Sequence, residues 1–450
     1  MGVMSIQRLL LTMAIPMMLS MMVQALYNIV DSIFVARLNE NALTAVTLTF
    51  PIQNLMIAIA VGTGVGINAF LSKSLGEKNF DAVNKSAMNG LLLVWISSAV
   101  FMLIGFLFSE VFFRAQTNSE EIIEYGKDYL SVVCIFSCIL FSQITFERLL
   151  TSTGKTFYAM ISQAAGAIIN IILDPLLIFG LAGFPAMAVK GAAIATVIGQ
   201  SAGTAIGLYF NLKVNREIRL SLKNLKPNKA IIRRIYSVGA PSILMASVGS
   251  VMLYGFNKIL ISFTATAIAV FGVFFKLQSF VFMPVFGLNN AMVPILAYNY
   301  GAGKKDRIIK TIKLGLLYSS GVMLAGFIAF ELFPAQLLLL FNAAEEMLSI
   351  GVTAFRTLSL VFLFAGFSIV FISVFQALGD GMASLCISVA RQLGVLLPAA
   401  WFLSLSGVLN TVWWAFPAAE CVSLVLSIVF MKRMYNKTLR LMKENVGAVE

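Results

Sequence analysis

Two carboxylates stand inside strongly apolar stretches in the first half of this 450-residue chain, each with polar neighbours at helical spacing. Gln24, Asn28 and Asp31 fall at positions i, i+4 and i+7 of one stretch, and Asn170 and Asp174 fall at i and i+4 of another. If the stretches are helices, each set shares one helical face. Amide and carboxylate oxygens are hard ligands that suit a sodium ion, and two coupled carboxylates can instead share a proton.

Thr196 adds a hydroxyl from a third apolar stretch. A rise of about 1.5 Å per helical residue places Asp31, Asp174 and Thr196 at a similar depth in their stretches. We therefore predict a cation-coupling site formed by Asp31, Asn170, Asp174 and Thr196, which holds either H+ or Na+. The alternative is that these groups satisfy a kinked backbone, as Pro175 would produce.

The elements that position these residues must be membrane-spanning helices. Hydrophobic residues make up 59% of the chain and charged residues only 12%, and about 20 apolar residues cross a bilayer as a helix. About twelve apolar runs follow one another, centred near residues 22, 58, 98, 140, 170, 199, 249, 281, 322, 365, 394 and 421. An even number puts both termini on one side, where the loops are rich in Lys and Arg, so both termini are expected in the cytoplasm.

The chain contains an internal repeat of half its length. A shift of the sequence by half its length superimposes Pro16 on Pro241, Gln53 on Gln278, Gly62 on Gly287, Gly76 on Gly301 and Gly154 on Gly379. We predict an all-α integral membrane protein of two pseudo-symmetric six-helix bundles: an N-terminal lobe (1–210) with the cation site, a basic cytoplasmic linker (211–235) and a C-terminal lobe (236–450). Two such lobes around a central cavity are typical of a transporter.

Further polar groups in the apolar runs are candidates for a substrate cavity, because a polar or ionisable group in hydrocarbon is costly. They are Gln24, Tyr27, Asn28, Glu147, Gln278 and Glu420. For Glu147 the alternative is an interfacial ion pair, and for Glu420 it is a pair with Arg391 or Lys276. The repeat places Phe256 at the position of Asp31, so we do not expect a second copy of the carboxylate site in the C-terminal lobe.

The composition also excludes several classes of function. The chain has no histidine and only four cysteines, so a Ser/His triad and a histidine zinc site are ruled out, and no enzyme and no cofactor is expected. The net charge of +12 lies mainly in short loops between the spans, which is the usual cytoplasmic bias rather than a nucleic-acid surface.

Three segments together resemble the MATE (multidrug and toxic compound extrusion) family. They are Asn170-Ile171-Ile172-Leu173-Asp174-Pro175, Gly191-Ala192-Ala193-Ile194-Ala195-Thr196 and Val293-Pro294-Ile295-Leu296-Ala297-Tyr298-Asn299-Tyr300-Gly301. The resemblance covers essentially the whole chain and is closest to the bacterial multidrug export branch typified by MepA and DinF. The connection between Asp174 and Thr196 is longer than in that branch.

The resemblance implies a MATE-type fold and a secondary active transporter that exports small cationic drugs and dyes by antiport with H+ or Na+. It also implies that Asp31, Asn170, Asp174 and Thr196 form the cation site, and it favours a role for Glu147. We expect a multi-pass protein of the bacterial cytoplasmic membrane, in contact with lipid and monomeric.

Two other functions are alternatives to drug export. A lipid-linked oligosaccharide flippase would need basic residues in its cavity, for which Lys258, Lys276, Arg356 and Arg391 are the candidates. The alternative for these four is snorkelling or pairing with acids. A membrane-embedded enzyme acting on lipids would need a nucleophile with a base, and the commonest base, histidine, is missing.

Overall fold

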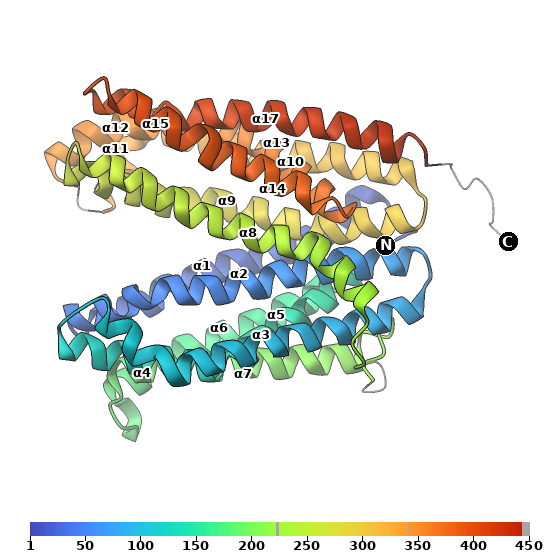
Figure 1. The fold of residues 1–450 in the computed structure, drawn as a ribbon, viewed down its shortest axis with the longest axis horizontal. Helices are drawn as coiled ribbons and strands as arrows, with labels where there is room; N and C mark the ends of the chain where they lie inside the picture. Colours follow the sequence, from blue (N-terminus) through green and yellow to red (C-terminus); the bar gives the residue numbers. More distant parts are fainter. Residues whose placement is uncertain (222–224, 342, 443–450) are drawn as a thin grey trace. The chain divides into compact units, whose positions relative to one another are not determined.

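The computed structural model describes residues 1–221, 225–341 and 343–442, and all regular secondary structure in these ranges is helical (Figure 1). Residues 222–224 of the predicted linker lie outside the described residues. Within the described ranges, ten helices are long and apolar enough to cross a membrane, and two bent pairs raise the number to as many as twelve. The prediction of an all-helical membrane protein with about twelve spans is confirmed.

Within residues 1–221, the chain forms seven α-helices and one short 3-10 helix. They are α1 (Ile6–Ala36), α2 (Glu40–Gly76), α3 (Phe80–Arg114), α4 (Glu120–Ile135), α5 (Ser137–Ser152), α6 (Thr156–Phe179), η1 (Leu181–Gly183) and α7 (Ala188–Lys213). The second half follows with α8 (Lys229–Ile261), α9 (Ala265–Gly301), α10 (Lys305–Leu332), α11 (Pro334–Leu339), α12 (Glu345–Ser359), α13 (Phe362–Ala377), α14 (Gly381–Val389), π-helical η3 (Ala390–Leu396), α15 (Leu397–Ser404), α16 (Leu409–Val412), α17 (Ala415–Met434) and π-helical η4 (Tyr435–Leu439).

Two of the predicted spans are broken rather than straight. The fourth bends by 48° between α4 and α5, and the tenth bends by 45° between α12 and α13. The breaks fall at Phe136 and at Val361, which the internal repeat superimposes on each other. The two halves therefore share a local backbone irregularity at the same position of the repeat.

Contacts divide the chain into two compact units. One unit is Leu19–Gly239, and the other combines Met1–Met18 with Ala240–Glu450. The division falls inside α1 and α8, shortly after Pro16 in α1 and just before Pro241 in α8. The first helix of each half is therefore shared, since its beginning groups with the other half of the chain.

The unit Leu19–Gly239 packs its helices through glycines and leaves apolar side chains on its surface. Gly66 on α2 has no room for a side chain, because a Cβ there would meet the carbonyl of Ile235. On α3, large apolar side chains such as Leu103 and Phe106 are exposed. An exposed apolar stripe of this kind is the face that a membrane helix presents to hydrocarbon.

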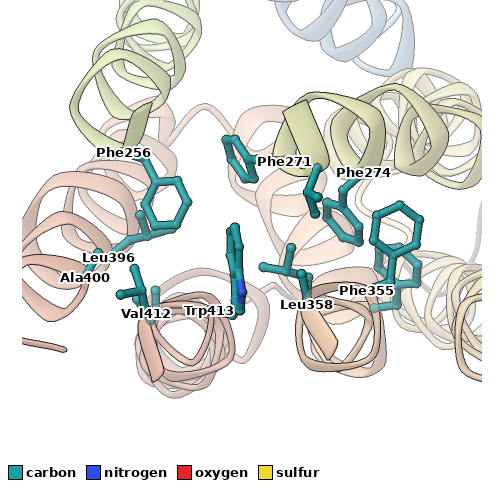
Figure 2. Close-up of a cluster of buried hydrophobic side chains, with 14 of the residues drawn as sticks. Phe256, Phe271, Phe274, Phe355, Leu358, Leu396, Ala400, Val412 and Trp413 are labelled. Atoms are coloured by element: carbon teal, nitrogen blue, oxygen red, sulfur yellow. The ribbon is translucent and has the colours of Figure 1, made fainter. Parts of the chain in front are cut away.

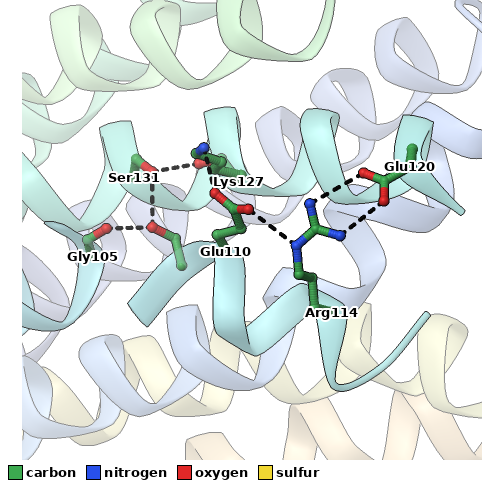
Figure 3. A network of polar contacts seen from close by, with 7 residues as sticks. Gly105, Glu110, Arg114, Glu120, Lys127 and Ser131 are labelled. Carbon is green, nitrogen blue, oxygen red and sulfur yellow. Dashed lines mark hydrogen bonds and ion pairs between the residues drawn. The ribbon is translucent and has the colours of Figure 1, made fainter. Parts of the chain in front are cut away.

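An exposed network of ion pairs joins the end of α3 to the beginning of α4 (Figure 3). Arg114 pairs with Glu110 at 3.0 Å and with Glu120 at 2.8 Å. Glu110 also accepts a hydrogen bond from Lys127 at 2.6 Å. Exposed pairs contribute little singly, so the network fixes the geometry of this connection more than it stabilises the unit.

The other unit is built around aromatic rings (Figure 2). Trp413 is fully buried and lies 6.0 Å from Phe256 and 6.4 Å from Phe271, measured between ring centroids. Phe256 is the residue that the repeat places at the position of Asp31. An apolar cluster therefore surrounds the position that corresponds to Asp31, in agreement with the expectation that the carboxylate site is not duplicated.

Candidate functional site

The predicted cation site depends on the close packing of α6 against α7. A Cβ on Gly199 would lie 2.6 Å from the carbonyl oxygen of Gly166, and a Cβ on Gly166 would lie 2.8 Å from the carbonyl oxygen of Gly199. Small residues at this crossing let the two backbones approach, as is common in membrane helix pairs. Asn170 follows Gly166 by one turn on α6, and Thr196 precedes Gly199 by almost one turn on α7, so both reach the same place.

Asn170 connects the polar side chains of these two helices. Its Nδ2 donates to Asp174 Oδ1 at 3.2 Å and lies 3.4 Å from Thr196 Oγ1. Asn170 and Asp174 are buried, and Thr196 is half-buried. The structure thus brings together three of the four residues predicted for the site, including Thr196 despite its longer connection through η1.

Asp31 reaches the same site from α1. It is half-buried, and its charge interacts electrostatically with that of Asp174. Three buried oxygens here have no hydrogen-bond partner: Oδ1 of Asp31, Oδ1 of Asn170 and Oδ2 of Asp174. Buried acceptors are normally paired, so these oxygens are free to bind a proton or a cation.

Two tyrosines lie around the carboxylates. The Tyr27 phenol interacts electrostatically with Asp31, Asp174 and Glu147. The buried Tyr129 interacts electrostatically with Asp31 and Asp174, and its hydroxyl accepts a hydrogen bond from Gln53 Nε2 at 3.2 Å. These interactions place both rings near the site.

Tyr129 and Gln53 are members of the site that the sequence analysis did not assign to it. Gln53 served there only as a marker of the repeat. Tyr129 lies past the middle of α4, a helix that begins with acidic residues, and its position in the sequence did not indicate a role in the site. The signal that reveals them is the pairing of α2 with α4, which is a tertiary contact.

The predicted substrate residues of this unit differ in their surroundings. Gln24 accepts a hydrogen bond from Gln163 Nε2 at 3.1 Å, and Glu147 on α5 accepts one from Gln143 Nε2 at 3.1 Å. Asn28 is exposed, although Gln24 and Asp31 on the same helix are half-buried. The shared face predicted for α1 is therefore only partly covered.

Gln278 and Glu420 belong to the other unit. Gln278 is half-buried on α9. Glu420 on α17 is buried and accepts a hydrogen bond from Arg391 Nη1 at 3.0 Å. This is one of the two pairings that the sequence analysis gave as the alternative to a role in the substrate cavity.

Among the described residues, no group of three or more His, Cys, Asp or Glu side chains is placed to hold a metal ion. A sodium ion at Asp31 and Asp174 would therefore also need the oxygens of Asn170 and Thr196. That set supplies carboxylate, amide and hydroxyl oxygens, which are the hard ligands that such a cation takes.

The sequence pattern of the MatE family matches this chain twice, at residues 16–176 and at residues 241–402. The chain belongs to the MatE family. The two matches begin at Pro16 and Pro241, a pair that the internal repeat superimposes, and together they cover well over half of the chain. The resemblance seen in the sequence is thereby confirmed, and members of this family are transporters.

Relatives match this MATE protein over almost its full length. The multidrug export protein MepA of Staphylococcus haemolyticus is 28% identical over 434 residues, which cover 95% of this chain and 94% of that protein. An FAD transporter of Shewanella oneidensis is 27% identical, over 88% of this chain and 87% of its own.

Solved structures agree with the fold. A transporter of the MOP superfamily from Pyrococcus furiosus superimposes with a TM-score of 0.89 at 25% identity, over 97% of each chain. A multidrug resistance MATE transporter in an outward-facing conformation gives a TM-score of 0.90 at 24% identity, again over 97% of each chain. The MATE-type fold is therefore confirmed.

Proposed function

We propose that this protein is a secondary active multidrug efflux transporter that exports amphipathic organic cations in exchange for H+ or Na+. The observation that carries the proposal is the set of three buried, unpartnered oxygens on Asp31, Asn170 and Asp174. The names of the MepA relatives, which are multidrug export proteins, support the kind of substrate.

Coupling follows if the ion and the drug favour different conformations of the protein. A ligand shifts an equilibrium only by its difference in affinity between two states, and the effect of one ligand on another is reciprocal. A monovalent ion bound at Asp31 and Asp174 would cancel one of the two negative charges there and relieve the electrostatic interaction between the carboxylates. Release of that ion would restore the negative charge of the carboxylates, which could then attract a cationic drug.

The residues around the site suit an organic cation. Tyr27 offers an aromatic ring close to the carboxylates, and Glu147 adds a further negative charge. Aromatic faces attract cations, and the attraction grows when the cation is desolvated. Gln24 and Asn28 on α1 are proposed as further polar contacts in this unit, and the role of Gln278 on α9 stays a prediction.

The flippase alternative is not favoured. Of its four candidate cations, Arg391 is paired with Glu420 at 3.0 Å and Arg356 lies 4.0 Å from Glu331. Lys258 lies over the ring of Tyr254, 5.8 Å from its centroid. A diphosphate would draw the two arginines away from these glutamates and leave the carboxylates unpaired, which is costly.

The cellular setting completes the proposal. We place the protein in the bacterial cytoplasmic membrane as a monomer, with both termini in the cytoplasm, with lobes at 1–210 and 236–450, and with no cofactor. The coupling ion is transported rather than kept, so Na+ would be a substrate of the site and not a resident metal.

The experiment that tests the function is ethidium transport in membrane vesicles under separately imposed gradients of Na+ and H+. Transport driven by one gradient would support the proposal and identify the ion. Absence of transport under both gradients, with the protein present in the membrane, would contradict it. A variant with Asp174 replaced by Asn serves as the uncoupled reference.

A further inference from the structure

The C-terminal part of the chain contains a charged pair formed by Arg391, which is half-buried, and Glu420, which is buried. Arg391 lies in the π-helical segment η3 and Glu420 on α17, and these two elements pack against each other. Arg391 Nη1 donates to Glu420 Oε2 at 3.0 Å. The other carboxylate oxygen, Oε1, is buried and has no partner.

The pair occupies the part of the repeat that corresponds to the cation site. The half-length offset of the repeat carries Arg391 to Gly166 and Glu420 to Ala195. Gly166 lies one turn before Asn170 on α6, and Ala195 precedes Thr196 on α7. The same pair of helices therefore carries polar groups in both halves, but with different chemistry in each.

Arg391 points away from the apolar surface of its helix. Met382, Cys386 and Val389 form an exposed stripe on α14, whereas Ser384 and Ser388, which precede Arg391 by seven and three residues, are buried. Arg391 continues the buried face, yet 30% of its side chain is exposed. A guanidinium has five N–H donors in a planar fork, so donors remain beyond the one given to Glu420.

Glu420 begins a polar stripe on α17. Ser423 and Ser427 follow it at i+3 and i+7, and both are buried. Ser423 Oγ lies 3.4 Å from Ser368 Oγ on α13, while Ser427 Oγ has no partner. The stripe therefore contains two buried oxygens without hydrogen-bond partners, Glu420 Oε1 and Ser427 Oγ.

The π-helical turn is a further sign of function at this site. Short π-helical segments inside α-helices are uncommon and are frequently found at functional sites. Here the π-helix carries Arg391 and also Gln392, whose Nε2 donates to Ser388 Oγ at 2.8 Å. The irregular backbone and the charged pair coincide.

We propose that Arg391 and Glu420 form a binding site for a zwitterionic substrate, with Arg391 receiving its carboxylate and Glu420 Oε1 receiving its cationic group. A ligand that carried only a negative charge would draw Arg391 away and leave Glu420 buried and unpaired, which is costly. A zwitterion supplies a partner for each charge. The inference rests on the proposed function, because it names the residues that would bind exported cations that also bear a carboxylate.

Two matched dyes test this proposal. Rhodamine 123 is the methyl ester of rhodamine 110, so the two share one cationic ring system and differ in whether the carboxyl group is free. Binding of each dye to the purified protein is measured by fluorescence anisotropy, and export of each is measured in vesicles. We expect the double variant Arg391→Gln/Glu420→Gln to lower the affinity for rhodamine 110, relative to the affinity for rhodamine 123, by about tenfold or more. This is the scale of a charged hydrogen bond.

The controls separate this site from general damage. Arg391→Lys keeps the positive charge beside Glu420 but loses the planar guanidinium. We therefore expect a smaller change in the ratio of the two dye affinities. Arg356→Gln/Glu331→Gln removes another Arg and Glu pair of the same unit, 4.0 Å apart, and should leave the ratio at the wild-type value.

Three results would overturn the inference. The first is a ratio of the two dye affinities that does not change in the Arg391 variants. The second is an equal change of this ratio in the Arg356 control. The third is a wild-type protein that exports rhodamine 123 but does not bind rhodamine 110. Failure of the wild type to bind or export either dye would instead overturn the proposed function, and with it this inference.

Discussion

Asn170 Nδ2 lies 3.2 Å from Asp174 Oδ1, and this contact determines which oxygens of the cation site are free. The amide nitrogen faces one carboxylate oxygen, so Asn170 Oδ1 and Asp174 Oδ2 are left buried without partners. Together with Asp31 Oδ1 they give the site three free acceptors. The first predictions follow from this arrangement.

Replacing Asp174 with Asn removes the charge but keeps the shape of the side chain. We expect ion-driven ethidium efflux to fall at least about tenfold, because the site loses one of its two carboxylates, while the protein stays in the membrane. Efflux from vesicles measures this. Asp128→Asn is the control, since Asp128 pairs only loosely with Lys190 at 3.9 Å. Efflux at the wild-type rate in the Asp174 variant would contradict the assignment of Asp174 to the cation site.

Replacing Thr196 with Val removes one hydroxyl and nearly preserves the volume. If Na+ is the coupling ion, we expect its half-saturating concentration to rise about fivefold, the scale of one polar contact. Transport assayed over a series of Na+ concentrations gives this value. An unchanged Na+ dependence in a sodium-driven protein would remove Thr196 from the ligand set.

Replacing Tyr129 with Phe deletes the hydroxyl that accepts from Gln53 at 3.2 Å. A buried amide that loses its partner costs about 1 to 3 kcal/mol, so we expect a lower melting temperature and weaker coupling. The double variant Tyr129→Phe/Gln53→Leu should recover part of the stability, because both polar groups are then gone. Thermal unfolding in detergent measures both; additive losses would show that the two side chains act independently.

Replacing Gly199 with Ala tests whether close packing positions the site. The new methyl group would lie 2.6 Å from the Gly166 carbonyl oxygen, and overpacking of this kind costs about 1 to 3 kcal/mol. We expect a lower melting temperature and reduced efflux, since α6 and α7 must separate. Gly321→Ala is the matched control, because a Cβ there meets nothing within 4 Å; equal effects of both changes would contradict the argument.

Replacing Trp413 separates packing from hydrogen bonding in the aromatic cluster of Figure 2. Trp413 is fully buried and its Nε1 has no partner. We expect Trp413→Ala to cost about 3 to 5 kcal/mol. Trp413→Phe should cost much less, because it removes an unsatisfied donor along with part of the ring. Chemical or thermal unfolding compares the two, and equal costs would show that the indole N–H is satisfied.

The sequence by itself determined the class and the plan of this protein. Apolar runs of about 20 residues identify membrane helices, and the repeat at half the chain length divides the chain in two. Polar groups such as Asn170 and Asp174 stand out in these runs because their four-residue spacing shows on one helix. All of these are local patterns, which can be read without knowing how helices pack.

Only the tertiary structure decided which side chains meet. Glu420 pairs with Arg391, 29 residues before it, rather than with Lys276, and Tyr129 pairs with Gln53 across 76 residues. The breaks in two spans and the π-helix at Arg391 likewise leave no periodic mark in the sequence. Such contacts depend on the rotation and crossing of helices distant in the chain, and hydrophobic periodicity does not encode either one.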